Sequence, residues 1–397
     1  MSINRYSKVS CIIYLFFVSV VAELIPVIRD VRYILIPILA LPIIVYLFLN
    51  KKSVMKTQFS RPVVYMICLC IFLIVISIFM MAYKNVWNTA FIREALFMFL
   101  PILLAWVFLA NSEYKDCRFI IDCFFYFTII TFLIRYWDVL SIDGILSVSF
   151  SESYSLYESE LVNIFLPLSF YYMFIDRRIV KALISILLCW LSMKRIHEIF
   201  LILYIIIFFL TFISPRFKKW LYLKNFSKFF EIVLIVIICL FPIILVSALS
   251  TDILNSFMIE NFGISLNAFM LGRENMYKVI LSNMDSIAGW GGTRDISFSL
   301  FGTNDMHSDI LRIYLETSIV GLIAFVTVFI KLMKRRWILL LYMGYVIAVM
   351  LVSPIITDTV GFVCIYIVLF ATLTKYKNKV YSKKTINTRA LIQPASC

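Results

Sequence analysis

The sequence predicts an all-α polytopic membrane protein with about twelve transmembrane helices. First, 63% of the 397 residues are hydrophobic and only 15% are charged, with a mean hydropathy of +0.97; soluble domains are about half apolar and a quarter charged. Second, the apolar residues come in blocks of roughly the 20 residues that an α-helix needs to cross a bilayer. Third, the period-two alternation of a transmembrane β-barrel is absent. Backbone polar groups cannot stay unpaired in lipid, so we expect helices.

The apolar blocks follow one another with mostly short connections and no internal repeat. The first block comes after a basic start (Arg5, Lys8), as in a signal peptide, but no A-x-A cleavage site follows it, so we expect a membrane helix. We expect one transmembrane domain over residues 1–374 and a basic cytoplasmic tail over 375–397. The expected spans are 9–28, 33–49, 62–82, 91–110, 119–137, 161–175, 179–193, 196–213, 229–250, 310–330, 337–353 and 356–374.

The distribution of charge predicts the orientation. An even number of spans places both termini on one side. If that side is the cytoplasm, 26 of the 37 Lys and Arg residues fall in inner segments and every inner loop is basic, as the positive-inside rule requires. Eighteen of the 23 Asp and Glu residues then fall outside. Because the basic residues are spread over short inner segments, the net charge of +14 does not indicate a nucleic-acid partner.

The nine cysteines do not predict a metal site or a disulfide framework. Most of them lie within or against apolar blocks, where cysteine behaves as a small hydrophobic residue. We therefore expect neither a metal nor another cofactor.

Two connections are long, and both are expected to face outward. Residues 138–160 are rich in Tyr, Ser and Glu; side chains such as Tyr157 suit contact with sugar rings, although an ordinary solvated loop fits equally well. Residues 251–309 form the longest polar interval of the chain. We expect this second loop to hold half of an active site.

Arg273 and His307 are the two strongest candidates in the larger loop. Arg273 precedes Met276, Val279, Ile280 and Met284, whose spacing predicts a short interfacial helix. Near the start of that helix, a planar guanidinium suits bidentate binding of a diphosphate. His307 lies at the start of the tenth span, and histidine is the usual general base near neutral pH. The glycines at 289, 291 and 292 indicate a turn.

Three further residues are candidate partners of His307. Asp309 would orient the imidazole, whereas Arg312 and Glu316 would support it from the first two turns of the tenth span. A solvated arginine at 273 and a water-bound histidine at 307 are the structural alternatives.

Two other outer positions carry charges that the topology does not explain. Lys194 and Arg195 form a basic turn between two apolar blocks, which an anionic ligand would favour. Arg93 and Glu94 open the fourth span on the outer side, beside the expected site. Other charged residues within the spans are Glu23, Asp122 and Arg135. They lie near helix ends, where a long side chain can reach the membrane interface. The same structural explanation is the simplest one for Arg93 and Glu94.

The segment around His307 resembles the signature loop of the O-antigen polymerase and ligase superfamily, and more narrowly that of Wzy-type O-antigen polymerases. The similarity covers roughly residues 270–325. It lies in Gly272-Arg273, the glycine-rich turn, His307-Ser308-Asp309, Leu315-Glu316 and Gly321.

The resemblance implies a GT-C-like membrane glycosyltransferase of lipopolysaccharide biosynthesis in the bacterial inner membrane. It would act without a metal, at the periplasmic face, on undecaprenyl-diphosphate-linked oligosaccharides. Membrane lipid and a chain-length regulator protein are the other expected partners. The resemblance implies that His307 accepts the proton of the acceptor hydroxyl. It also implies that Arg273 and the Lys194-Arg195 turn bind the diphosphate.

Two alternatives stay open. His-Ser-Asp, where ligases commonly show His-Asn, favours a polymerase over an O-antigen ligase acting on lipid A-core. A flippase or other transporter would be expected to bury charges along a central cavity and to keep its outer loops short, which the sequence does not indicate.

Overall fold

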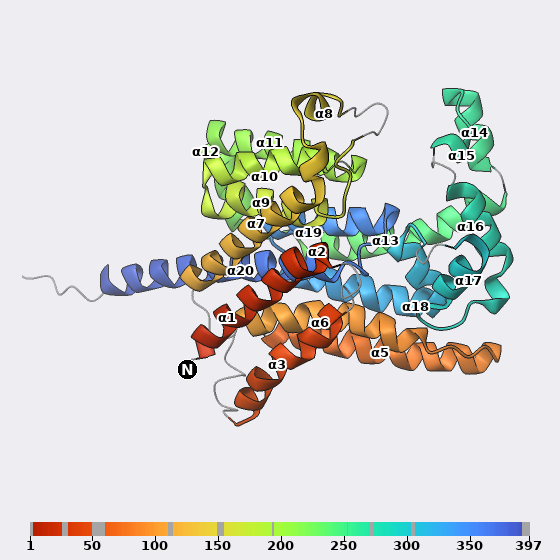
Figure 1. Cartoon of the computed structure of the whole chain (residues 1–397), viewed down its shortest axis with the longest axis horizontal. Helices are drawn as coiled ribbons and strands as arrows, with labels where there is room; N and C mark the ends of the chain where they lie inside the picture. Colours follow the sequence, from red (N-terminus) through yellow and green to blue (C-terminus); the bar gives the residue numbers. More distant parts are fainter. Residues whose placement is uncertain are drawn as a thin grey trace, which may run out of the picture. The chain divides into compact units, whose positions relative to one another are not determined.

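The computed structural model describes residues 3–25, 31–49, 60–109, 114–148, 155–192, 194–251, 253–269, 273–302 and 306–390. Within these ranges the chain is helical and contains no β-strand (Figure 1); one isolated antiparallel bridge joins Asn225 and Arg336. The predicted all-α class is confirmed for this part of the chain.

The chain divides into two compact units. Unit 1 comprises residues 1–63, 101–213 and 360–397, and unit 2 comprises residues 64–100 and 214–359. Each unit is discontinuous in sequence, so the helices α5 (Ser60–Lys84) and α6 (Ala90–Leu109) contribute residues to both.

Unit 1 is built on packing of α9 against α10 and of α1 against α7. Its charged side chains near helix ends are paired: the Asp122 carboxylate lies 2.8 Å from both Arg178 Nη1 and Lys181 Nζ, and Arg135 pairs with Glu23. These ion pairs agree with the structural role that we expected for Glu23, Asp122 and Arg135 near helix ends. Besides parts of α5 and α6, the unit contains α1 (Ile3–Phe16), η1 (Phe17–Val21), α2 (Ala22–Leu24), α3 (Val31–Leu49), α7 (Tyr114–Tyr136), η3 (Trp137–Val139), α8 (Ile142–Leu146), α9 (Val162–Phe170), η4 (Tyr171–Asp176), α10 (Ile179–Leu191), α11 (Arg195–Ile213) and α20 (Thr359–Ala390).

Unit 2 is centred on α18, which packs against α13 and α19. Five short helices lie between α13 and α18 in the described part of the expected outer loop. Besides parts of α5 and α6, the unit contains α12 (Pro215–Leu223), α13 (Lys228–Ser250), α14 (Ile253–Phe262), α15 (Leu266–Phe269), α16 (Arg273–Ser282), η5 (Met284–Ser286), α17 (Gly292–Phe301), α18 (Asp309–Leu332) and α19 (Trp337–Val352).

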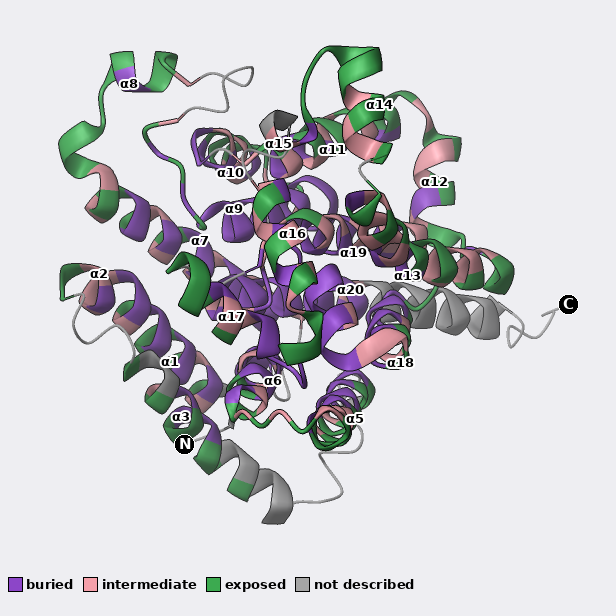
Figure 2. Cartoon of the chain, turned by 90° about the vertical axis from the view of Figure 1, so that its right-hand side faces the viewer, coloured by how far each residue is buried: buried purple, intermediate pink, exposed green. Residues whose placement is uncertain are grey.

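Among the described residues, seven helices are long and apolar enough to cross a membrane, and four shorter apolar helices accompany them. Within the described residues, each of the twelve ranges expected to span the membrane overlaps one to three consecutive helical segments. Their outer sides expose large apolar residues, for example Phe79 (68%) and Ile244 (62%), as lipid-facing helices do (Figure 2). The chain is thus a helical protein of membrane type, and twelve crossings stay a prediction.

The helix α18 is broken at Ser318. This residue has φ 63° and ψ 179°, a conformation that is essentially restricted to glycine and costs about 1–3 kcal/mol for other residues. Just after the break, a Cβ on Gly321 would meet the Thr317 side chain at 2.1 Å, so a glycine is required there. The break separates a first segment, which carries the candidate site residues of this helix, from an apolar second segment.

The two ends of α18 differ in charge. At its start lies loop 251–309, which has seven acidic and three basic residues in the sequence. At its other end lie residues 214–228 and 331–336, which together have nine basic residues and no acidic one. Unit 2 thus has one basic end, as the positive-inside rule expects of a cytoplasmic face.

Candidate functional site

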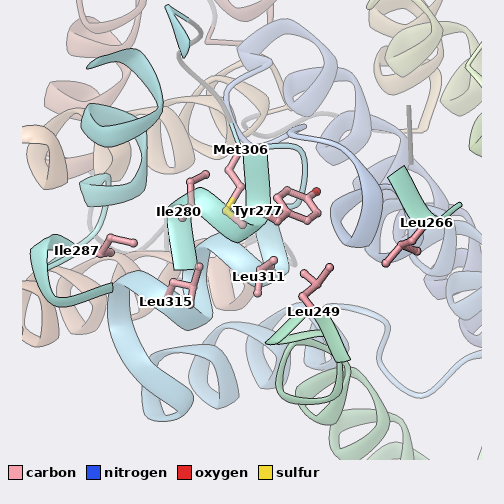
Figure 3. Close-up of a cluster of buried hydrophobic side chains, with 8 residues drawn as sticks. All are labelled: Leu249, Leu266, Tyr277, Ile280, Ile287, Met306, Leu311 and Leu315. Carbon is pink, nitrogen blue, oxygen red and sulfur yellow. The ribbon is translucent and has the colours of Figure 1, made fainter. Parts of the chain in front are cut away.

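The described residues of loop 251–309 are folded onto the ends of α13 and α18 by a hydrophobic cluster (Figure 3). Tyr277 and Ile280 of α16 pack with Leu249 at the end of α13 and with Leu311 and Leu315 of α18. The other members of the cluster are Leu266, Ile287 and Met306. Because Met306 directly precedes His307, the cluster brings α16 to the beginning of α18.

The predicted helix after Arg273 is present, and two of its four predicted apolar residues, Met276 and Ile280, pack in or against the hydrophobic cluster. In α16 the buried residues are Glu274, Tyr277 and Ile280, whereas Val279 and Met284 are 37% and 38% exposed. Burial raises the pKa of the Tyr277 phenol to about 12, and the nearby Arg273 guanidinium partly offsets this rise. The aromatic residue was missed because the prediction followed only the aliphatic spacing.

Arg273 opens α16 and is half-buried. Its Nη1 donates to the carbonyl oxygen of Val352, the last residue of α19, at 3.3 Å. Nε and Nη2 have no protein acceptor within the described ranges, so this side of the guanidinium has the donor pair that a phosphate would need. Gly272, which is part of the predicted Gly-Arg motif, lies outside the described residues.

His307 is half-buried and lies one residue before Ser308, which caps α18. The Ser308 hydroxyl accepts from the Leu311 amide at 3.2 Å and donates to the Met350 carbonyl at 3.4 Å. Capping orders the start of the helix by satisfying an amide that would otherwise lack a partner. The position of His307 is therefore set by both α18 and α19.

Asp309 is fully buried and anchors the same region. Its Oδ2 accepts hydrogen bonds from the amides of Ile355 and Ile356, at 2.7 Å and 2.9 Å. The structure thus uses this carboxylate to hold the chain that follows α19. The expected orientation of His307 by Asp309 stays a prediction.

These contacts gather Arg273 and His307 around residues 350–356. Arg273 bonds to Val352, and the two residues after His307 bond to Met350, Ile355 and Ile356. Two residues that are far apart in the sequence thus share one anchoring segment. We define Arg273, His307, Asp309 and residues 350–356 as the candidate site. A pocket of about 420 Å³ opens nearby and is lined by Leu249, Ser250, Lys278, Leu281 and Ser282.

Arg312 and Glu316 belong to a buried ion-pair cluster behind the site. Arg312 Nη2 lies 2.6 Å from Glu94 Oε2, and Arg312 Nε lies 3.6 Å from Glu316 Oε2. Arg294 Nη1 approaches Glu94 Oε1 at 3.3 Å. Glu316 also accepts from the amide and hydroxyl of Thr293. Two arginines thus balance two carboxylates.

The cluster corrects the interpretation of Glu94. From its position near a helix end, the side chain was expected to extend to the membrane interface. It is instead fully buried. Its neighbour Arg93 is exposed, with Nε 3.7 Å from Glu94 Oε1. Arg294 and Thr293 were missed, and the only signal for them was the adjacent glycine turn.

The glycine turn packs against the junction of α5 and α6. Residues 287–293 are buried, and Gly289 and Gly291 have φ values of +74° and +91°. A Cβ at Gly289 would meet the Met81 side chain at 2.9 Å, and one at Gly291 would meet Ala90 Cβ at 2.7 Å. Asn88 and Lys84 donate to carbonyls of the turn. The prediction of a turn is confirmed.

Lys194 and Arg195 lie in unit 1. Arg195 is exposed and begins α11, and the Lys194 carbonyl accepts from the His197 amide at 2.8 Å. His197 is fully buried, with Nε2 2.8 Å from Asn163 Oδ1. The candidate site described above lies in unit 2, so the participation of Lys194 and Arg195 stays a prediction.

Tyr157 in the smaller outer loop is a structural residue. Its ring is fully buried against Phe132 and Tyr136, and its hydroxyl donates to the Val139 carbonyl at 3.0 Å. The expected contact of this side chain with sugar rings is therefore wrong.

Comparison of the chain with protein-family models, with curated proteins and with solved structures gave no match.

Proposed function

We propose that the chain is an O-antigen polymerase, a glycosyltransferase of the GT-C-like membrane class. It transfers a growing glycan from one polyprenyl diphosphate to a repeat unit on a second one, at the periplasmic face of the inner membrane. The observation that carries the proposal is the anchoring of Arg273, and of Ser308 and Asp309 directly after His307, on residues 350–356.

The proposed reaction needs one group that accepts a proton and another that stabilises the negative charge on the leaving diphosphate. The acceptor hydroxyl of the repeat unit attacks the anomeric carbon of the donor glycan and loses its proton to the His307 imidazole. The bond between the anomeric carbon and the diphosphate oxygen breaks, and its electron pair leaves with the diphosphate. Arg273 then stabilises this charge with Nε and Nη2. Diphosphate leaves well, so the reaction as written needs no metal.

The test is the polymer made in a strain that lacks the gene. His307→Ala and Arg273→Ala should both abolish long polymer while the protein still accumulates in the membrane. Lys278→Ala is the matched control, because this cation lies on the same helix but is paired with Glu274 at 2.8 Å. Normal polymer ladders from the His307 and Arg273 variants would overturn the site.

The product separates the polymerase from a ligase. Loss of a polymerase leaves lipid A-core bearing a single repeat unit, whereas loss of a ligase leaves lipid-linked polymer and bare core. Bare core together with lipid-linked polymer would replace the proposal by the ligase alternative.

One observation favours a transporter of lipid-linked oligosaccharides as the second candidate. Glu94, Arg312 and Glu316 are fully buried among apolar helices, and buried charges commonly mark transport pathways. Purified protein in vesicles decides between the two. Formation of longer glycan from the lipid-linked repeat unit supports the polymerase, whereas movement of the lipid across the bilayer without elongation supports the transporter.

A further inference from the structure

Two basic segments of unit 2 are joined into one surface at the end of α18 remote from the candidate site. Residues 214–228 precede α13, and residues 331–336 connect α18 to α19. An antiparallel bridge joins Asn225 to Arg336, and the Phe226 amide donates to the Arg335 carbonyl at 2.8 Å. The backbone therefore holds the two loops together.

Aromatic side chains reinforce this link. The rings of Trp220, on α12, and Trp337, at the start of α19, have centroids 4.7 Å apart. Phe226 and Phe230 lie 5.7 Å and 5.4 Å from Trp337, and Phe217 stacks on Trp220 at 5.6 Å. The loops are thus linked by a cluster of aromatic contacts, of which Phe226 is the buried member.

The turn between α18 and α19 has an unusual backbone. Lys334 and Arg335 both have left-handed φ values, 46° and 53°, which are uncommon for residues other than glycine. The adjacent bridge and hydrogen bond to residues 225 and 226 hold this geometry. The cations of the turn are therefore presented on a constrained loop.

The joined loops concentrate positive charge. Glu231 pairs with one of these cations, with Oε2 3.8 Å from Arg335 Nε. We call these nine residues the basic platform: Arg216, Lys218, Lys219, Lys224, Lys228, Lys331, Lys334, Arg335 and Arg336.

Exposed apolar side chains lie in the same segments as these cations. Trp220 and Leu223 of α12 are exposed, and so are Phe229 and Ile232 at the start of α13. A helix with basic and apolar residues at this position suits the boundary between head groups and acyl chains. Basic clusters next to membrane helices bind anionic head groups. A soluble acidic partner would need the cations but not the apolar residues.

We propose that the basic platform is a binding site for the phosphate head groups of anionic phospholipids, built by the pairing of the two loops. Neither the candidate site nor the proposed enzymatic activity is used in this inference, so it can fail or hold independently of them.

The experiment compares lipid binding by the purified full chain and three variants. The charge variant is Lys219→Ala/Lys224→Ala/Lys331→Ala, which changes three exposed side chains. The pairing variant is Trp220→Leu, which keeps every charge but removes the tryptophan contact. The control is Lys377→Ala/Lys383→Ala/Lys384→Ala, which removes three charges from the basic tail. Each protein is titrated with vesicles of phosphatidylcholine alone or mixed with phosphatidylglycerol, and retained lipid is counted by native mass spectrometry.

The wild type and the control should prefer phosphatidylglycerol in a salt-sensitive manner. Each basic residue near the surface contributes about fivefold, so the charge variant should bind roughly 100-fold more weakly. The pairing variant should also lose the preference, provided that its thermal unfolding in detergent is unchanged. If it unfolds, Phe217→Leu replaces it.

Three outcomes would overturn the proposal. Equal retention of phosphatidylglycerol by all variants would exclude the site. If the charge variant loses the preference for phosphatidylglycerol and the pairing variant keeps it, the lipid is attracted by net charge alone and the pairing of the loops is not needed. Absence of lipid preference, together with salt-sensitive binding of poly-glutamate, would assign the surface to an acidic protein instead.

Discussion

Arg312 Nη2 lies 2.6 Å from Glu94 Oε2, and this fully buried ion pair joins α18 to α6 within unit 2. The two residues are 218 positions apart in the sequence. Their pairing holds the helix that begins directly after His307. The stability of this pair is therefore tied to the geometry of the candidate site.

The ion pair should be needed for stability. Arg312→Ala removes one of the cations that balance the buried Glu94 carboxylate. We expect the free energy of unfolding to fall by about 3–5 kcal/mol. Glu94→Ala should cost a similar amount, because it leaves Arg312 and Arg294 facing each other without the carboxylate. The measurement is thermal or denaturant unfolding in detergent.

A double variant separates the pair from its surroundings. Glu94→Ala/Arg312→Ala should be less destabilised than the sum of the single variants, by about 0.5–3 kcal/mol. Arg93→Ala is the control, since this exposed neighbour should change stability little. Strict additivity would contradict a direct interaction.

Gly291→Ala should destabilise unit 2 more than Gly302→Ala. Both glycines have positive φ values, +91° and +67°, so both variants lose about 1 kcal/mol to backbone strain. At Gly291 the new Cβ also meets Ala90 Cβ at 2.7 Å, whereas nothing lies within 4 Å at Gly302. Overpacking adds about 1–3 kcal/mol. Equal unfolding temperatures for the two variants would contradict the packing of the turn on α6.

Asp309→Ala should loosen the chain after α19. The variant leaves the buried amides of Ile355 and Ile356 without their acceptor, at about 1–3 kcal/mol for each unsatisfied group. Hydrogen exchange of these two amides should accelerate. Asp309→Asn keeps an acceptor oxygen and should preserve more of the protection; if both variants exchange like the wild type, the anchor is not formed.

Arg195 and His197 should respond in different ways. Arg195 is exposed, so Arg195→Ala should shorten or abolish polymer without a loss of protein, if this residue binds the diphosphate as proposed. His197 is buried against Asn163, so His197→Ala should reduce stability. Polymer length and thermal unfolding, measured on both variants, distinguish the roles; full-length polymer from Arg195→Ala would contradict its predicted role in diphosphate binding.

The sequence determined the helical class and the ranges of the apolar helices. Hydrophobic blocks such as residues 62–82 and 229–250 exceed what a soluble core needs, and lipid allows few other backbone structures. Local signals also predicted the turn at Gly289–Gly292 and the helix after Arg273. These features depend on neighbouring residues, so they can be read along the chain.

Only the tertiary structure decided which polar residues meet. Glu94 looked interfacial because it lies near the start of a helix, but a buried arginine from α18 pairs with it. Nothing in the sequence indicated that Asp309 Oδ2 holds the amides of Ile355 and Ile356. The pairing of the loops at Asn225 and Arg336 also left no local trace. Long-range pairing depends on how helices pack, and hydrophobicity and charge along one chain do not specify it.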